Sequence, residues 1–166
     1  MGDWKKDVAW LLVALLIVVG FEYGLRLALH TDTPLVIVIS GSMEPVFYKG
    51  DVVVLKGVNP DSIHVGNVIV YKRPGFEYPI IHRVRYIGTL NLNGKTERCF
   101  VTWGDNNPVP DPAYPLKNGG YSSITMYIKG FGYYDAGCVP ASDVEAKAVF
   151  VIPKVGWIPL WLREHL

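Results

Sequence analysis

LVIVISGSMEP, at residues 35–45, joins a short apolar run to a small polar turn. The five aliphatic residues at 35–39 are typical of a buried β-strand, because most of them are β-branched and a turn follows at once. Ser42 lies just beyond this run, where its hydroxyl is expected to be exposed. A hydroxyl held at the end of a rigid strand can attack a carbonyl when a base lies within hydrogen-bond reach. Ser42 is therefore a candidate nucleophile.

Candidate partners for this serine follow downstream. His82 lies in another apolar run, at residues 80–84, and Asp105 and Asp111 lie in the polar segment GDNNPVPD at residues 104–111. Triads of serine, histidine and aspartate are recognised by geometry and role, and their order along the chain differs among unrelated folds. Spacing alone leaves a second interpretation open, in which His82 is a hydrogen-bonded structural residue of its strand.

Several segments of the chain, taken together, resemble a known family. They are, in chain order, SGSMEP at 40–45, KGDVV at 49–53, VGNVIVY at 65–71, IHRV at 81–84 and GDNN at 104–107. In this order they resemble the sequence boxes of type I signal peptidases, and the segment at 149–158 is similar to the end of that family's domain. The resemblance implies a signal-peptidase-like β domain. It also implies a membrane-bound serine endopeptidase that removes signal peptides from secreted preproteins after small residues.

The identity of the base separates two branches of this family. Bacterial members use a serine and lysine dyad, whereas the archaeal and endoplasmic-reticulum branch has histidine in place of the lysine. His82 occupies that position here, and Lys72 and Lys95 fall outside the matching box. The chain therefore resembles the archaeal and endoplasmic-reticulum branch, which implies acyl transfer to water with His82 as general base.

Two aspartates compete for the third position of the triad. In the archaeal and endoplasmic-reticulum branch the later aspartate is the triad member, so the resemblance assigns that role to Asp111 and a supporting role to Asp105. Pro108 and Pro110 restrict the backbone before Asp111 and would hold it at a defined distance from the turn. Asp105 lies in the tight GDNN string, where its side chain is expected to bond its own turn backbone.

The residues around Ser42 are expected to bind the substrate. By resemblance, the backbone N–H of Ser42 and the hydroxyl of Ser40 would donate to the oxyanion. Gly41 would let the substrate strand approach the backbone closely. Small substrate side chains would enter a shallow pocket lined by the apolar residues near the nucleophile, Ile37, Ile39 and Met43.

The N-terminal segment predicts a membrane anchor at residues 1–30. The chain has 166 residues, 50% of them hydrophobic, and a mean hydropathy of +0.22, more apolar than one soluble domain of this size needs. The excess lies at residues 8–21, which are apolar without a break. About 20 residues are needed to cross the hydrocarbon, so the extension to Leu29 contributes. Only Glu22 and Arg26 are charged there, and their spacing of four lets them pair on one helix face.

A cleavable signal peptide is the alternative for this segment, because Lys5 and Lys6 precede its hydrophobic core. No small-x-small cleavage site follows, so an uncleaved anchor is expected. The two lysines favour a cytoplasmic N-terminus, although Asp3 and Asp7 flank them. We therefore expect a single-pass protein of the cell membrane with its catalytic domain outside the cytoplasm, an orientation that the resemblance also implies.

Residues 31–156 predict a β catalytic domain. Short runs rich in Val, Ile and Tyr, bounded by Gly, Pro, Asn or Asp, predict strands at 36–39, 52–55, 68–71, 80–86, 99–103 and 148–152. NLNG at residues 91–94 has the turn chemistry of a hairpin between two of these runs. No long helical period appears after residue 30. The fold class is therefore mainly β, on a single N-terminal transmembrane helix.

Two later segments extend this domain. Residues 112–140, rich in tyrosine and glycine, are longer than a connector before the closing strand and predict an insertion. Their aromatic side chains suit the headgroup level of a bilayer, and they suit a locally packed surface loop or hairpin equally. Residues 157–166 are apolar but too short to span and include a proline. They are expected to lie at the interface or to pack on the β domain.

The remaining features limit the partners. A net charge of +1 gives no nucleic-acid footprint, and no His, Cys or carboxylate cluster has metal-ligand spacing, so no metal or other cofactor is expected. Cys99 and Cys138 are compatible with a disulfide in an oxidising compartment, which two cysteines alone do not decide. The expected partners are signal peptides of preproteins, the lipid bilayer and a secretion channel.

Two alternatives to a general signal peptidase stay open. In one, the same fold processes a narrower class of precursors. In the other, a non-catalytic, membrane-anchored β domain binds a secretion partner. Ser42, His82 and both aspartates weigh against the second alternative, since an idle site has no physical reason to retain all of them.

Overall fold

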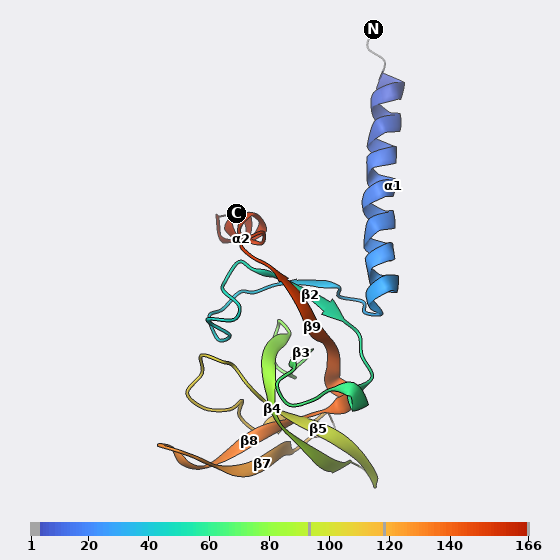
Figure 1. The fold of residues 1–166 in the computed structure, drawn as a ribbon. Coiled ribbons are helices and arrows are strands. Elements are labelled where there is room, and N and C mark those ends of the chain that lie inside the picture. Colours follow the sequence, from blue (N-terminus) through green and yellow to red (C-terminus); the bar gives the residue numbers. More distant parts are fainter. Residues whose placement is uncertain (1–3, 93, 118, 166) are drawn as a thin grey trace.

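The computed structural model describes residues 4–92, 94–117 and 119–165. The chain begins with the long helix α1 (Trp4–Leu29), which stands away from a β domain, and ends with the short helix α2 (Trp157–His165) (Figure 1). None of the residues of α1 is buried, and an 18-residue stretch of it has a mean hydropathy of 2.2, apolar enough to cross a membrane. Its 26 residues extend about 39 Å at about 1.5 Å per residue, which exceeds the hydrocarbon thickness of about 30 Å. Arg26 pairs with Glu22 at 2.6 Å, as their spacing predicts.

Within the described residues, the β domain is built on one sheet of nine strands. The strands are β1 (Leu35–Ile37), β2 (Val52–Lys56), β3 (Val68–Tyr71), β4 (Ile80–Leu92), β5 (Lys95–Trp103), β6 (Tyr114–Pro115), β7 (Tyr121–Ile128), β8 (Gly132–Pro140) and β9 (Val144–Ile152). Their order across the sheet is β1-β2-β9-β3-β4-β5-β8-β7-β6, and the neighbours are antiparallel. Two 3₁₀ turns, η1 (Pro60–Ser62) and η2 (Ala141–Asp143), complete the domain. The predicted mainly β class is confirmed.

The predicted strands are all present; β3 has the predicted ends, and the ends of the others differ. β1 stops at Ile37, so Val38 and Ile39 already belong to the connection to the serine turn. β4 and β5 continue as a long two-stranded ribbon to the pair Leu92↔Lys95. This pair flanks the predicted hairpin turn, of which residue 93 lies outside the described residues. The length of the ribbon was underestimated because its outer half alternates polar and apolar residues. The continuous apolar run that predicts a buried strand covers only the inner half.

The core lies on both faces of β3. Val68 and Val70 pack in one cluster with Val53 and Leu55, whereas Ile69 and Tyr71 pack in a second cluster around other strands. This division follows from the two-residue period of a strand, which sends successive side chains to opposite faces. A strand buried on both faces has no polar position, which explains the continuous apolar sequence of β3.

The tyrosine-rich segment at 112–140 forms a hairpin that belongs to the sheet. β7 and β8 pair from Ser123↔Gly137 to Ile128↔Gly132, and β8 also pairs with β5. Of the two predicted interpretations, the hairpin is the one observed. Figure 1 shows β7 and β8 at the end of the domain away from α1, which does not favour the headgroup level. Cys99 and Cys138 form a disulfide between β5 and β8.

The first residues of the C-terminal segment pack against the β domain. Leu160 is buried, and the backbone N–H of Gly156 donates to the carbonyl of Gly50 at 2.9 Å. Among the described side chains of α2, four large apolar ones are exposed: Trp157, Ile158, Trp161 and Leu162. In Figure 1, α2 lies beyond the β domain on the same side as α1.

A close backbone contact joins the anchor to the β domain. The N–H of Gly57 donates to the carbonyl of Leu29 at 2.8 Å, at the last turn of α1. A Cβ atom at position 57 would lie 1.8 Å from the carbonyl oxygen of His30. Because the obstacle is backbone, it cannot move aside as a side chain would, and only glycine fits this position.

We expect Gly57→Ala to destabilise this joint by about 1–3 kcal/mol, the usual cost of forcing extra volume into a packed site. Chemical unfolding of the detergent-solubilised protein measures the change. Gly24→Ala is the matched control, since no atom lies within 4 Å of a Cβ at that position. Equal stability of the two variants would show that the contact does not constrain the joint.

Candidate active site

Ser42 lies in a turn that the neighbouring GDNN segment holds from outside. The backbone N–H of Asn106 donates to the carbonyl of Ser42 at 2.9 Å, and its side-chain amide donates to the carbonyl of Gly41 at 3.0 Å. A Cβ at Gly104 would lie 2.6 Å from the Ser42 carbonyl oxygen. The glycine at position 104 therefore permits the approach that fixes the backbone of the serine.

His82 extends from β4 to the hydroxyl of Ser42. The distance from Nε2 to the Ser42 Oγ is 3.0 Å, and Nδ1 lies 2.7 Å from Oδ2 of Asp111. A carboxylate can only accept, so Nδ1 carries the proton of the neutral imidazole and Nε2 is left to accept from Ser42. The three predicted triad residues are thus within hydrogen-bond distance in the order that general-base catalysis requires.

The carboxylate of Asp111 is buried and receives two further hydrogen bonds. The hydroxyl of Tyr71 donates to Oδ2 at 2.9 Å, and that of Thr102 donates to the same oxygen at 2.6 Å. Burial of its ring, followed by the negative charge of Asp111, raises the pKa of Tyr71 well above its ordinary value. Tyr71 therefore remains a protonated donor. These donors offset the free-energy cost of burying the carboxylate.

Asp105 occupies a different environment and does not bond its own turn backbone as predicted. Its carboxylate accepts two hydrogen bonds from the guanidinium of Arg83, at 2.9 and 2.7 Å, and one from Arg85 at 2.7 Å. The hydrogen bonds from Arg83 lower the pKa of Asp105 below its ordinary value. Two arginines offer stronger, charge-assisted donors than the turn, and the turn is closed instead by the N–H of Asn107 on the Gly104 carbonyl.

Ser40 lies next to the candidate nucleophile, Ser42. Its Oγ is 3.3 Å from the Oγ of Ser42, and Ser40 and Ser42 both line an apolar cavity. The predicted function of this hydroxyl toward the oxyanion stays a prediction.

An apolar cavity of about 820 Å³ opens beside Ser42 and His82. Ile37 and Ile39 line it as predicted. Met43 does not, because its side chain is fully buried in the core with Val53 and Leu55. The prediction of Met43 as a pocket residue is therefore wrong, since a side chain directed into the core stabilises the serine turn from below and cannot face the substrate.

Gly41 also lies outside the cavity lining. A Cβ there would lie 2.9 Å from Oε1 of Glu44, so the glycine accommodates a side chain of its own turn. The predicted approach of a substrate strand at Gly41 stays a prediction.

Sequence reasoning missed two other walls of the cavity. One is the connection between β3 and β4, including Phe76 and Tyr78, and the other is α2, through Pro159 and Leu160. The sequence RPGFEYP at residues 73–79 was a usable signal, because aromatic residues between prolines directly precede the histidine strand. The contribution of α2 had no such signal, since most of the β domain separates it from this loop in the chain.

Comparison with known proteins identifies the family of the chain. The chain is 33% identical over 147 residues to the signal peptidase complex catalytic subunit SEC11 of Komagataella phaffii, covering 87% of this chain and 75% of the relative. It is 35% identical over 144 residues to the sec11 subunit of Pyrenophora teres, covering 86% and 70%. The chain belongs to the family of signal peptidase catalytic subunits. Human SEC11C of this family is 31% identical over 142 residues, covering 86% of this chain and 64% of the relative.

No protein-family model matches the chain. The predicted resemblance to the archaeal and endoplasmic-reticulum branch of type I signal peptidases is nevertheless confirmed by these relatives. As a member of this family, the chain is a signal peptidase and hence a peptide hydrolase.

We expect Asp105→Asn to lower the free energy of unfolding by about 1–3 kcal/mol at pH 7, because it leaves charged donors unpaired. The pKa of Asp105 is lowered in the folded protein, so its ion pairs stabilise fully above the ordinary aspartate pKa of about 3.9 and lose this effect as pH falls through the lowered value. The difference in free energy of unfolding between Asp105→Asn and the natural protein should therefore become smaller below about pH 4.

Urea unfolding at several pH values measures this difference in free energy. Asp61→Asn is the control, since the Asp61 side chain is 80% exposed and lies 3.8 Å from Arg98, and it should change stability by less than about 0.5 kcal/mol. A difference in free energy of unfolding for Asp105→Asn that stays constant down to pH 2 would contradict the stabilising role of the Asp105 ion pairs.

Proposed function

We propose that this chain removes signal peptides from secreted preproteins with Ser42 as nucleophile and His82 as general base. The observation that carries this proposal is the line from Ser42 Oγ to His82 Nε2 at 3.0 Å and from His82 Nδ1 to Asp111 at 2.7 Å. His82 takes the proton of Ser42 as its oxygen attacks the scissile carbonyl, and it returns the proton to the leaving amine. Water then attacks the acyl-enzyme while His82 takes its proton, and His82 returns the proton to the oxygen of Ser42 as the ester bond breaks.

Asp111 acts through His82. It accepts the Nδ1 proton, holds the imidazole in the tautomer that leaves Nε2 free to accept, and stabilises the imidazolium that forms during attack. Asp105 supports the site from outside through Arg83, which follows His82 in β4. Its ion pairs fix the strand position from which the imidazole extends.

The oxyanion is bound by the backbone N–H of Ser42 and the hydroxyl of Ser40. The short distance between the two serine hydroxyls, 3.3 Å, supports this role for Ser40. One such donor contributes roughly 3 kcal/mol to transition-state stabilisation in comparable sites.

Small substrate side chains are accepted by the part of the cavity next to Ser42. Ile37 and Ile39 restrict its width there, and both lie in its wall together with the nucleophile. An apolar wall favours the uncharged small residues that precede a signal-peptide cleavage site.

The chain is a single-pass protein of the cell membrane, with a cytoplasmic N-terminus and the catalytic domain on the outer side. Lys5 and Lys6 before the apolar helix support this orientation, and so does the Cys99–Cys138 disulfide, since such bonds persist in oxidising compartments. α2 lies in the membrane interface through its outward Trp157 and Trp161, in agreement with its place on the side of α1 (Figure 1). Confinement next to membrane-inserted precursors, delivered by a secretion channel, raises the effective substrate concentration.

Two alternatives are distinguished by one assay. A non-catalytic binding domain is disfavoured because the three triad groups lie within hydrogen-bond distance, and a narrower substrate class would appear as selectivity among precursors. The purified, detergent-solubilised protein is mixed with several model preproteins, and mass spectrometry locates each cut.

In this assay Ser42→Ala should lower the rate by a factor of about 10³ or more, since loss of a triad nucleophile leaves only oxyanion and binding effects. Its expression and membrane insertion should be unchanged. Ser123→Ala is the control, because Ser123 is an exposed serine on β7, outside the cavity lining. Cleavage by Ser42→Ala near the natural rate would exclude the serine mechanism.

Protease accessibility should establish the orientation. Lys129 is exposed at the tip of the β7–β8 hairpin, so trypsin added to right-side-out vesicles should reach this tip. An epitope tag placed before Lys5 should stay protected until the vesicles are lysed. The opposite pattern, with the tag digested and the hairpin protected, would reverse the orientation.

A further inference from the structure

Asp111 lies at a fork between β5 and β8. The two strands pair from Cys99↔Pro140 to Val101↔Cys138, and beyond this pair they separate to admit the segment that carries Asp111. The backbone N–H of Asp111 donates to the carbonyl of Thr102 on β5 at 3.0 Å. Its carbonyl accepts from the N–H of Gly137 on β8 at 2.7 Å. The backbone of Asp111 is therefore held from both sides.

The contact with β8 is too close for a side chain. A Cβ at Gly137 would lie 2.3 Å from the carbonyl oxygen of Pro112, and a β-bridge between Pro112 and Ala136 continues the contact. Any displacement of β8 is thus transmitted to the backbone of Asp111, because no flexible side chain separates the two.

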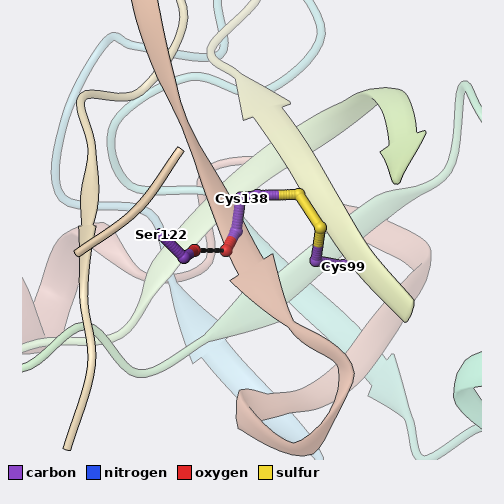
Figure 2. Close-up of a disulfide and its surroundings, with 3 residues drawn as sticks. All are labelled: Cys99, Ser122 and Cys138. Atoms are coloured by element: carbon purple, nitrogen blue, oxygen red, sulfur yellow. Dashed lines mark hydrogen bonds between the residues drawn. A yellow bond between two sulfur atoms is a disulfide. The ribbon is translucent and has the colours of Figure 1, made fainter. Parts of the chain in front are cut away.

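A covalent bond fixes β8 to β5 at this fork. The Cys99–Cys138 disulfide crosses between the two strands, and both cysteines are fully buried. Cys138 directly follows Gly137 in the chain. Figure 2 shows that the hydroxyl of Ser122, on β7, donates to the carbonyl of Cys138 from the side opposite the disulfide. The position of Cys138 is therefore restrained by β5 and by β7.

We propose that the Cys99–Cys138 disulfide and Gly137 are positioning residues of the active site, which hold Asp111 at the distance that orients His82. The proposal rests on the proposed function, in which Asp111 acts on Nδ1 of His82. Three donors converge on Oδ2 of Asp111, and a shift of about 1 Å in a positioned group can reduce a rate by up to about 100-fold. The tyrosine-rich hairpin thereby contributes to catalysis without touching the substrate.

A double-mutant cycle separates positioning from general stabilisation. Cys99→Ala/Cys138→Ala is prepared alone and together with Asp111→Asn, and single-turnover cleavage of a model preprotein is measured at a temperature where circular dichroism shows every variant folded. We expect the cysteine double variant to lose about tenfold in rate with Asp111 present. In the Asp111→Asn background it should lose less than about twofold, since the carboxylate that it positions is already gone.

Gly137→Ala tests the same contact with the disulfide intact. Its Cβ displaces Pro112, and its rate loss should again be large with Asp111 present and small in the Asp111→Asn background. It also covers the case in which the cysteine double variant fails to fold. Ile128→Ala, a nearly buried position at the far end of the β7–β8 pairing, is the matched control. It should lower the melting temperature and leave the rate unchanged.

Equal rate losses in the two backgrounds, or full activity of both folded variants, would overturn this inference. Failure of the proposed function has a different signature, because Ser42→Ala would then remain active. An inactive Ser42→Ala together with fully active cysteine and glycine variants removes only the positioning role.

Discussion

The buried carboxylate of Asp111 is the constraint around which the site is arranged. A carboxylate removed from water is unfavourable unless donors surround it, and Oδ2 of Asp111 receives three, from Tyr71, His82 and Thr102. These donors come from β3, β4 and β5, which are consecutive neighbours in the sheet. The order of the strands therefore determines where the imidazole can lie, and the imidazole in turn determines where the serine must be.

Two aspartates of one short segment have different tasks because their surroundings differ. Asp105 faces two arginines and forms ion pairs that hold the GDNN turn against β4. Asp111 faces two neutral hydroxyls and the imidazole, so its charge is directed at His82. His82 and Arg83 are adjacent in β4, and successive side chains of a strand point to opposite faces. One strand thereby separates the candidate catalytic histidine from the cation that pairs with Asp105.

The end of the β domain next to α1 carries the contact with this helix, and α2 at the same end lines the cavity that contains Ser42. The contact of Gly57 with the end of α1 fixes where the helix leaves the sheet. Pro159 and Leu160 of α2 enter the wall of the cavity that contains Ser42. The tyrosine-rich hairpin lies at the other end (Figure 1), yet β8 reaches back to the Asp111 backbone. Both ends of the domain thus act on one site.

The sequence by itself determined the apolar N-terminal helix, the mainly β class and the choice of Ser42, His82 and Asp111 as candidates, because apolar runs and short motifs are local properties of the chain. It placed Met43 at the substrate and the side chain of Asp105 in its own turn, and it predicted no strand at residues 132–140. Those errors share a cause: local patterns show that a residue is apolar or acidic, but not which distant residue faces it. Only the tertiary structure decided that Met43 points into the core, that Asp105 meets two arginines, and that Cys99 bonds Cys138 beside Asp111, since each depends on the register of strands far apart in the chain.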